Sequence, residues 1–336
     1  MTPRSYQVEG HRIFPNVLLA PMEGVTDVIF RRLVRQIGGC GLTTTEFVPS
    51  LGLSRGDKQI RQMVRFDDDE RPVAIQIFGR DPAIMAEGAR VVEDLGATFV
   101  DINMGCPSKK VCAHSGGSAL MREPELAVEI VRAVRAAVRI PVTVKMRSGF
   151  DPSHKNAPEL AWRCQEEGAA AVAIHWRTRE DQYGGVRDVR PIAEAKARVS
   201  IPVIANGDIV DVPSALAMFE ETGCDGVMIG RGAMKNPWVL RQIADVLAGR
   251  SPTRVDPLEK QRVIVGFLED QRLRARTEQG ALGRFKGVAK HFFDSRDTGA
   301  REVRMRILRS QTIDEAKGIA TEWYEELARR DQSTAA

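Results

Sequence analysis

Short apolar runs rich in β-branched residues alternate with longer amphipathic segments through the first 250 residues of the chain. Several of the runs are continuously apolar, which is typical of strands in a parallel sheet that is covered on both faces. We therefore predict a strand at each run. The eight predicted strands are Val17–Met22, Gly41–Glu46, Val73–Gly79, Thr98–Asn103, Val142–Arg147, Ala171–His175, Pro202–Asn206 and Asp225–Gly230.

The segments between these runs have helical periodicity, as in Pro82–Gly96, Pro124–Val138, Asn156–Gly168 and Val212–Gly223. Three of them end in a glycine, which suits a helix C-cap in the left-handed conformation. Eight β/α units over about 250 residues predict an α/β fold of the (β/α)8 TIM barrel type. A doubly wound sheet is the alternative, because strand order cannot be read from the sequence.

The pattern changes after Gly249. The stretch GRSPTRVDP predicts a linker, and residues 258–328 contain helix-compatible segments and no convincing strand. We therefore expect a barrel over residues 1–250 and a small all-helical C-terminal domain over residues 251–336.

The formal net charge is only +4, which argues against a uniformly polybasic nucleic-acid binder. Between Arg254 and Arg309, however, fourteen Lys and Arg face eight Asp and Glu, a local excess of +6. A solvated helix surface and a binding surface for an acidic partner both fit this excess. No apolar run is long enough to span a membrane, and the odd number of dispersed cysteines argues against a disulfide scaffold and a zinc site. These features predict a reduced, cytoplasmic protein without a metal.

Polar residues follow seven of the eight predicted strands. In a TIM barrel these positions form the mouth at the C-terminal face, where functional side chains gather. Polar residues at so many strand ends are hard to explain by packing, and they predict a polar ligand that binds across the mouth. The residues are Pro21, Met22 and Glu23 after the first strand, Gln76 in the third, Asn103 and Cys106 at the fourth, Lys145 and Arg147 in the fifth, His175, Arg177 and Arg179 at the sixth, Asn206, Gly207 and Asp208 at the seventh, and Gly230 and Arg231 at the eighth.

The last two strand ends predict a phosphate site. The turns NGDI and GRGAM allow backbone N–H groups to approach an anion, and Arg231 adds a charged donor. Lys145 and Arg147 alternate within VTVKMR and should share one face, where two buried cations need an anionic or electron-rich partner. A cation beside a hydride-accepting ring would stabilise the negative charge of a reduced flavin. Pairing of Lys145 with Asp101 is the structural alternative.

Cys106 lies between Gly and Pro in a turn where packing does not require sulfur. Because an ordinary thiol is mostly protonated at neutral pH, Cys106 can serve as a general acid. A Cys/His nucleophile is the less supported alternative, since His175 is the only histidine at a strand end. Motifs for a dinucleotide, a P-loop or a paired-histidine metal site are absent from the sequence.

Collinear motifs from about residue 18 to residue 238 resemble the tRNA-dihydrouridine synthases, flavin enzymes that reduce a uracil ring in tRNA. They include LAPMEGVTD, TEFV, QIFG, DINMGCPSKKV, GGSALM, VTVKMRSG, HWRTRE, PVIANGDI and VMIGRGAMKNPW, with a weaker echo in GRFKGVAKHFF. The resemblance implies an FMN-binding barrel followed by a helical tRNA-binding domain.

The resemblance also implies roles for individual residues. Lys145 and His175 match the flavin-facing pair, Asn103 would orient the uracil, and Cys106 matches the proton donor. In the implied mechanism NADPH (or NADH) reduces FMN, flavin N5 delivers hydride to uracil C6, and Cys106 protonates C5 from the opposite face. Pro21, Met22, Glu23 and Gln76 match flavin contacts, and Asn206, Gly207, Asp208, Gly230 and Arg231 match the phosphate end. Arg147, Arg177 and Arg179 remain candidates for substrate contacts at the mouth.

The helical domain then has a reason to be locally basic. Candidates for tRNA phosphate contacts are Arg272, Arg274, Arg276, Arg284, Lys286 and Lys290, with charge reversal at the last two expected to weaken tRNA binding. Two alternatives stay open: a flavin barrel acting on a free pyrimidine, like dihydroorotate dehydrogenases, and an RNA-binding protein that has lost catalysis. The sequence specifies neither the tRNA position nor the oligomeric state, and a monomer is compatible with it.

Overall fold

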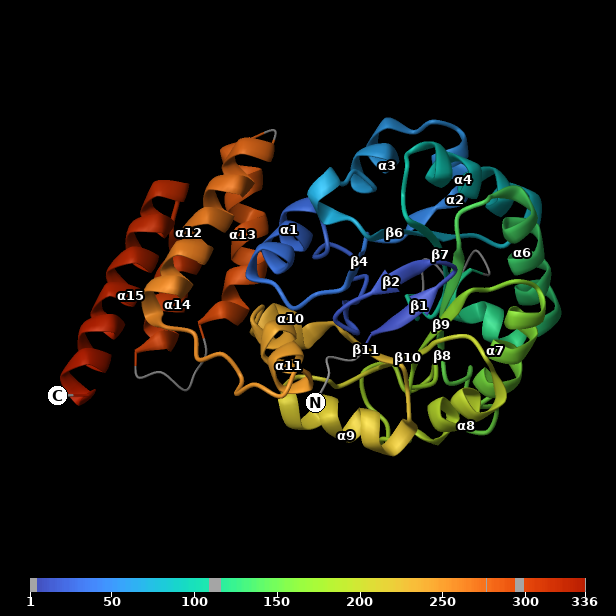
Figure 1. Ribbon diagram of the computed structural model, residues 1–336. Helices are drawn as coiled ribbons and strands as arrows, with labels where there is room; N and C mark the ends of the chain where they lie inside the picture. The colour runs from blue at the N-terminus through green and yellow to red at the C-terminus, as the bar shows by residue number, and fades with distance from the viewer. Residues whose placement is uncertain (1–4, 109–115, 276, 294–298, 336) are drawn as a thin grey trace.

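The computed structural model describes residues 5–108, 116–275, 277–293 and 299–335. In this part of the chain a closed barrel of strands ringed by helices lies beside a bundle of long C-terminal helices (Figure 1). The N-terminal segment lies at the barrel, and the C-terminus ends the outermost helix of the bundle.

Eight parallel strands close the barrel, as the hydrophobic pattern predicts. Each strand pairs with the next in sequence order, and the last pairs with the first, which excludes the doubly wound alternative. The strands are β3 (Val17–Leu19), β4 (Leu42–Thr44), β6 (Val73–Phe78), β7 (Phe99–Met104), β8 (Val142–Arg147), β9 (Ala171–His175), β10 (Val203–Asn206) and β11 (Gly226–Ile229).

The predicted strand ends differ most at β3. The prediction extended it to Met22, whereas the ladder ends at Leu19. Pro21 has no backbone N–H to donate to a neighbouring strand, so the chain leaves the sheet just before it. Pro21, Met22 and Glu23 therefore lie in the loop above the strand.

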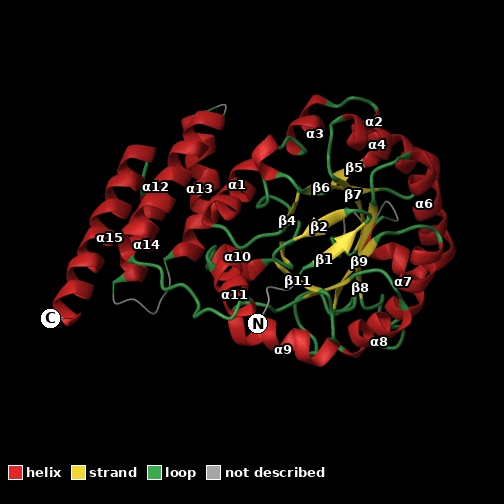
Figure 2. Cartoon of the chain, viewed as in Figure 1, coloured by secondary structure: helices red, strands yellow, loops and turns green. Residues whose placement is uncertain are grey.

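Helices surround the strands on the outside of the barrel (Figure 2). The predicted C-cap glycines have positive φ angles, and Gly223, at 64°, is in the left-handed conformation that ends α9. The outer helices are α1 (Val28–Ile37), α4 (Pro82–Asp94), α6 (Pro124–Ala137), α7 (Ala157–Glu166), α8 (Arg190–Arg198), α9 (Val212–Thr222) and α11 (Val239–Leu247). Shorter elements are α2 (Ser50–Ser54), α3 (Lys58–Met63), η1 (Asp68–Glu70), η2 (Gly117–Arg122) and α10 (Arg231–Lys235).

Three of the strands, β1 (Tyr6–Val8), β2 (His11–Ile13) and β5 (Val48–Pro49), were not predicted. An antiparallel hairpin of β1 and β2 lies across the barrel, and its buried side chains join an interior apolar cluster with Phe99. The two-residue strand β5 adds a parallel pair to β6. Because the hairpin covers the end at which the strands begin, the mouth at the opposite end is the one left for a ligand.

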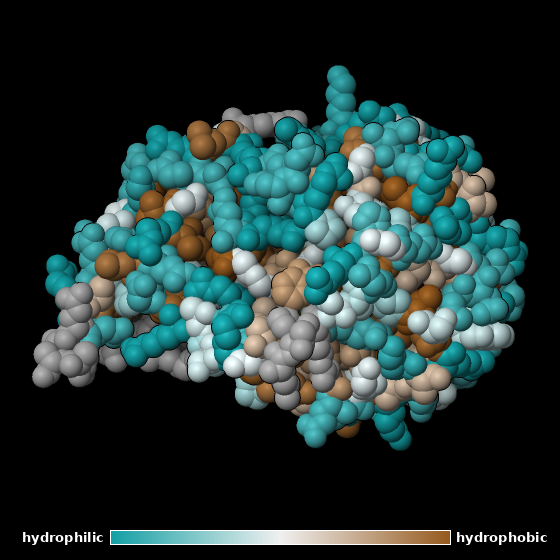
Figure 3. All heavy atoms as spheres, viewed as in Figure 1, coloured by the Kyte–Doolittle hydropathy of each residue, from teal (hydrophilic) through white to brown (hydrophobic). Residues whose placement is uncertain are grey.

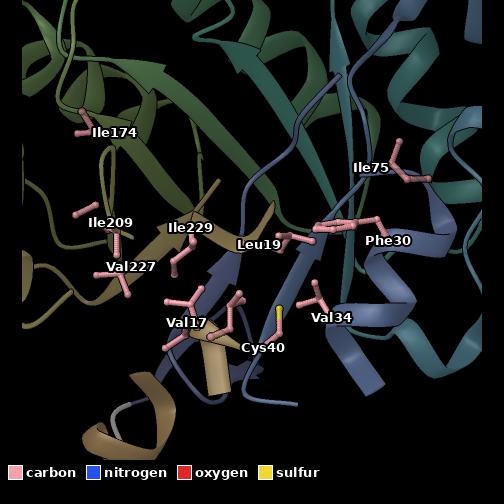
Figure 4. Close-up of a cluster of buried hydrophobic side chains, with 14 of the residues drawn as sticks. Val17, Leu19, Phe30, Val34, Cys40, Ile75, Ile174, Ile209, Val227 and Ile229 are labelled. Carbon is pink, nitrogen blue, oxygen red and sulfur yellow. The ribbon is translucent and has the colours of Figure 1, made fainter. Parts of the chain in front are cut away.

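The main core lies between the strands and the outer helices. Figure 4 shows side chains of β3, β11 and α1 meeting there, with Leu19 and Phe30 among the fully buried ones. One ion pair is also buried in this region: Arg31 Nε lies 2.7 Å from Glu70 Oε2, and both side chains are fully buried. It fixes α1 to η1 beside the barrel.

Four helices follow the residues that were predicted as a linker: α12 (Pro257–Arg274), α13 (Glu278–Phe292), α14 (Ala300–Arg309) and α15 (Ile313–Ala335). The bundle packs on the barrel through an edge-to-face contact of Phe267 with Phe30, and through the Trp238 indole N–H, which donates to Glu259 at 3.0 Å. An ion pair of Arg274 with Asp67, at 2.9 Å, joins the same two parts.

Polar residues dominate the face of the molecule seen in Figure 3, with small scattered apolar patches. No helix in the described part of the chain combines the length and apolar character needed to cross a membrane.

Candidate active site

A cavity of about 900 Å³ opens at the mouth of the barrel, within the size range of cofactor pockets. Its lining comes from the loops and strand ends at the C-terminal face, as the sequence predicts for a TIM barrel. Fourteen of the predicted site residues line it: Pro21, Met22, Glu23, Gln76, Asn103, Cys106, Lys145, Arg147, His175, Asn206, Gly207, Asp208, Gly230 and Arg231.

A chain of hydrogen bonds crosses the cavity floor between β6, β7 and β8. The Asn103 amide donates to Gln76 Oε1 at 2.8 Å, and Gln76 Nε2 donates to Asp101 at 2.5 Å. Asp101 accepts a further hydrogen bond from the Thr143 hydroxyl at 2.5 Å. Burial raises the pKa of Asp101, while these two donors and Lys145 favour its carboxylate. The chain fixes the orientation of both amide side chains.

Lys145 is a half-buried cation that faces the cavity. Its ammonium donates to Asn206 Oδ1 at 3.0 Å, and the Asn206 amide is itself held by the Met228 carbonyl at 2.7 Å. Burial, together with the nearby Arg147, lowers the pKa of Lys145 to about 8. Lys145 and Asp101, which are both described, form no ion pair with each other. The alternative in which Lys145 pairs with Asp101 is therefore not observed.

His175 lies at the end of β9 beside this cation. Burial and the neighbouring positive charges, Lys145 first, lower the pKa of His175 well below its ordinary value. Its Nδ1 accepts a hydrogen bond from the Arg177 backbone N–H at 3.1 Å. The imidazole is therefore neutral at physiological pH, with Nε2 carrying the proton.

Arg147 lines the cavity, but its N–H groups donate hydrogen bonds to backbone carbonyls of the protein. Its guanidinium donates to the carbonyls of Gly105 at 2.9 Å, Thr178 at 2.6 Å and Gln182 at 3.2 Å. Burial lowers its pKa to about 10. The expected electron-rich partner is thus a set of carbonyls, which ties the loops after β7 and β9 together across the mouth.

Cys106 sits half-buried in the cavity wall after β7. Asn103 Oδ1 accepts the backbone N–H groups of Gly105 and Cys106 at 3.0 and 2.9 Å, which shapes the turn. From the other side, the Ser118 hydroxyl donates to the Cys106 carbonyl at 2.9 Å. The side chain predicted to orient a substrate therefore also positions the thiol. The cysteines left as core in the sequence, Cys40, Cys164 and Cys224, are buried, and Cys112 lies outside the described residues.

Two βα turns form the opposite end of the cavity. The backbone N–H groups of Gly207, Asp208, Gly230 and Arg231 make no hydrogen bond to any described residue. Gly207 has a φ of 114°, and a Cβ there would approach the Trp176 ring to 2.5 Å, so only glycine fits this turn. Donors without protein partners are what an anion such as a phosphate group requires.

Asp208 joins two arginines beside these turns. It accepts two hydrogen bonds from the Arg177 guanidinium, at 3.0 and 2.7 Å, and one from Arg231 at 2.9 Å. Arg177 is buried and stacks on Trp176, whereas Arg231 is half exposed and lies over Tyr183. Of the two, Arg231 lines the cavity and Arg177 supports it through Asp208.

The other predicted substrate residues do not line the cavity. Arg179 packs against Phe150 on the rim, and Lys286 donates to the Ser310 carbonyl at the end of α14, at 2.5 Å. Lys290 lies in α13, but its side chain is outside the described residues. In the bundle, Arg272 and Arg284 are held by Asp314 and Gln271.

Several lining or supporting residues were missed at the sequence level. Phe47, Gln182 and Tyr183 line the cavity from loops, where periodicity carries no signal. Glu46, inside the TEFV motif, accepts the Gly24 N–H and so holds the loop above β3. Burial raises the pKa of Glu46. Its charged side chain at the end of the second predicted strand was the signal that could have identified it.

Acidic, histidine and cysteine side chains form no cluster suited to a metal ion among the described residues. The polar groups of the cavity instead comprise the Lys145 ammonium, the Cys106 thiol, the amides of Gln76 and Asn103, and backbone N–H groups without protein partners. That donor set suits an anionic, aromatic organic ligand.

Comparison with known proteins identifies the family of the chain. A sequence profile of the family described as Dihydrouridine synthase (Dus) matches residues 18–327. A "Probable tRNA-dihydrouridine synthase" of Rhodobacter capsulatus is 45% identical over 249 residues, which cover 74% of this chain and 76% of the relative. The "tRNA-dihydrouridine synthase B" of Pseudomonas aeruginosa is 40% identical over 307 residues, covering 91% and 92% of the two chains.

Solved structures share the barrel at low sequence identity. Morphinone reductase in complex with tetrahydroNAD has a TM-score of 0.52 at 14% identity and covers 76% of this chain and 93% of its own. 2-Naphthoyl-CoA reductase, with its naphthoyl-CoA ligand, has a TM-score of 0.55 at 14% identity and covers 74% of this chain and 52% of its own. These likenesses concern the fold, whereas the family profile and the relatives cover most of the sequence. The chain therefore belongs to the dihydrouridine synthase family of flavin-dependent oxidoreductases.

Proposed function

We propose that the chain reduces the C5–C6 double bond of a uridine in tRNA, with FMN as cofactor, NADPH (or NADH) as electron donor and Cys106 as proton donor. The observation that carries the proposal is the joint presence of Cys106 and the half-buried cation Lys145 in one cavity at the barrel mouth. Family membership makes tRNA uridine the substrate class. Because tRNA is found in the cytoplasm, we place the reaction there.

The residues of the cavity fit FMN at both of its ends. The open N–H groups of Gly207, Asp208, Gly230 and Arg231, with the Arg231 guanidinium, provide donors for the phosphate. Lys145 gives one hydrogen bond to Asn206 and has further N–H donors for the ring end. When bound, FMN supplies the hydride that a uracil ring accepts at C6.

The chain's own part in the reaction is to position and protonate the uracil. Cys106 lies in the cavity wall on a turn held by Asn103 and Ser118, so its thiol has a defined place from which to donate a proton to C5. The neutral His175 adds a donor without adding charge. Lys145 remains the positive group that offsets negative charge near the ring.

A uridine in folded tRNA has to leave its stack to enter this cavity, as in other enzymes that act on a base. The helical bundle over residues 251–336 is our proposed tRNA-binding domain, because it joins the barrel directly and a free base needs no such surface. Lys286, Arg272 and Arg274 each bond to another group of the protein, so charge reversal there changes the contacts of the bundle as well as its charge. On α14, Arg301 and Arg309 are exposed and form no ion pair with a described residue, so they are better first targets for mutation.

The direct test is to incubate purified protein with FMN, NADPH and unmodified tRNA and to map dihydrouridine by mass spectrometry. We expect one uridine position to be converted, and conversion to stop in Cys106→Ala. Cys224→Ala is the matched control, because Cys224 is buried in the core away from the cavity. Reduction of free uracil or orotate, with tRNA left unchanged, would support the free-pyrimidine alternative instead.

A further inference from the structure

Two arginines stack on one phenylalanine at the rim of the barrel mouth. The guanidinium carbon of Arg122 lies 3.6 Å from the centroid of the Phe150 ring, and that of Arg179 lies 5.2 Å from it. Arg122 ends η2, and Arg179 follows β9, so the two come from different βα loops. We call Arg122 and Arg179 the rim arginine pair.

The pair has no acidic partner within the described part of the chain. The carboxylates closest to it in sequence bond elsewhere or face solvent: Glu123 pairs with Arg80 at 3.1 Å, Asp151 holds His154 at 2.9 Å, and Glu180 is exposed. The segment of residues 109–115, KKVCAHS, contains no acidic residue either.

Other basic side chains of the neighbouring loops are neutralised. Arg177 pairs with Asp208, Lys155 with Asp188, and Arg187 with Glu221, the last two pairs at 2.6 and 2.7 Å. The rim arginine pair departs from this pattern, and Arg179 also buries its Nε without a hydrogen-bond partner. Two positive charges lie against the Phe150 ring, and one N–H donor has no partner. Such an arrangement is stabilised by an anion from outside the chain.

The pair is fixed to the wall of the cavity. Arg147, which lines the cavity, donates to the carbonyl of Thr178, the residue before Arg179. The Arg179 backbone N–H donates to Gly149 at 3.0 Å, just before Phe150. On the other side, Ser118 of η2 donates to the Cys106 carbonyl. The stacked arginines thus stand in a set position beside the mouth, on loops that also position the thiol.

We propose that the rim arginine pair binds phosphate groups of the tRNA backbone next to the extruded uridine. The inference rests on the proposed function, since it names a second contact surface for the same substrate. Guanidinium groups bind phosphate oxygens through two parallel N–H donors, and stacking on Phe150 orients them in advance. The tRNA is then held on two sides of the cavity, by the helical bundle and by the loops after β7 and β9.

The test measures tRNA affinity of the full-length, FMN-loaded protein at several salt concentrations. In Arg122→Ala/Arg179→Ala we expect about tenfold weaker binding at physiological salt, and a salt dependence reduced by about one to two phosphate contacts. The rate at saturating tRNA and the FMN content should stay unchanged. The double Lys variant keeps both charges but lacks the paired N–H donors and the stacking on Phe150, so its affinity should lie between those of the wild type and the double Ala variant.

Arg198→Ala is the matched control. Arg198 also stacks on an aromatic ring, that of Trp162 at 5.0 Å, but it ends α8 at the opposite end of the barrel. It should leave tRNA binding unchanged. Equal affinity and equal salt dependence in the wild type and the double Ala variant would overturn the rim contact alone. A wild-type protein that neither binds tRNA nor forms dihydrouridine would instead overturn the proposed function on which it rests.

Discussion

Lys145→Met should stabilise the flavin-free protein at neutral pH while removing its activity. The pKa of Lys145 falls from 10.5 to about 8 because the ammonium is buried beside Arg147. A drop of that size means that the folded state disfavours the charged form by about 3 kcal/mol. Methionine has a similar length and carries no charge, so the substitution removes this penalty.

Loss of the hydrogen bond from Lys145 to Asn206 lowers the free energy of unfolding and so opposes this gain. Without the ammonium, Asn206 Oδ1 loses its donor, and an unsatisfied buried acceptor costs about 1–2 kcal/mol. The net expectation is a gain of about 1–2 kcal/mol in the free energy of unfolding at pH 7.

This gain should disappear as pH rises. Between the folded pKa of about 8 and the unfolded value of 10.5, the unfolded state of the wild type binds more protons than the folded state. Stability of the wild type therefore rises through this window, by about 2 kcal/mol at pH 9.5, and the variant has no such increase. The two proteins should then be about equally stable.

Urea unfolding of flavin-free protein at pH 7 and pH 9.5, followed by tryptophan fluorescence, measures both values. Lys155→Met is the control, because this lysine is paired with Asp188 at 2.6 Å and its loss should bring no gain at either pH. A Lys145→Met variant that is less stable than the wild type at pH 7, by an amount that does not change at pH 9.5, would refute the reasoning.

Three further predictions concern the thiol proposed as proton donor, the proposed phosphate end of the cavity and the core. Cys106→Ala should lower the rate of dihydrouridine formation by about 100-fold or more with FMN content unchanged, and a full rate would remove the proton-donor role. Arg231→Met should weaken FMN binding about tenfold, measured by flavin fluorescence, but leave riboflavin binding unchanged, because riboflavin has no phosphate. Arg31→Met should lower the free energy of unfolding by about 3–5 kcal/mol because it leaves Glu70 as an unpaired buried charge; recovery in Arg31→Met/Glu70→Leu would confirm the cause, and an unchanged urea midpoint in the single variant would contradict it.

The hydrophobic pattern predicts the barrel well because a parallel sheet buries both faces, which leaves a continuous apolar signal in each strand. The β1–β2 hairpin has three residues in each strand and mixes apolar with charged positions, so its sequence carries too little periodicity. Its place across the barrel depends on contacts with residues far along the chain, such as Phe99.

The site also has one part that could be predicted from the sequence and one part that could not. Strand ends could be read from the sequence, and barrel closure then brings Gln76, Asn103 and Lys145 around one cavity. Side-chain partners could not be read from the sequence: Lys145 bonds to Asn206, 61 residues away, and Arg147 donates to backbone carbonyls of two different loops. Local charge likewise predicted a basic bundle, whereas individual bonds such as that of Lys286 with Ser310 appear only once the helices pack.

The central claim is tested most directly by mapping dihydrouridine in tRNA from cells that lack this gene and from cells that carry it. The account predicts that one uridine position loses its modification on deletion, that the intact gene restores it, and that a Cys106→Ala gene does not. An unchanged dihydrouridine map in the deletion strain, or full restoration by the Cys106→Ala gene, would contradict the account.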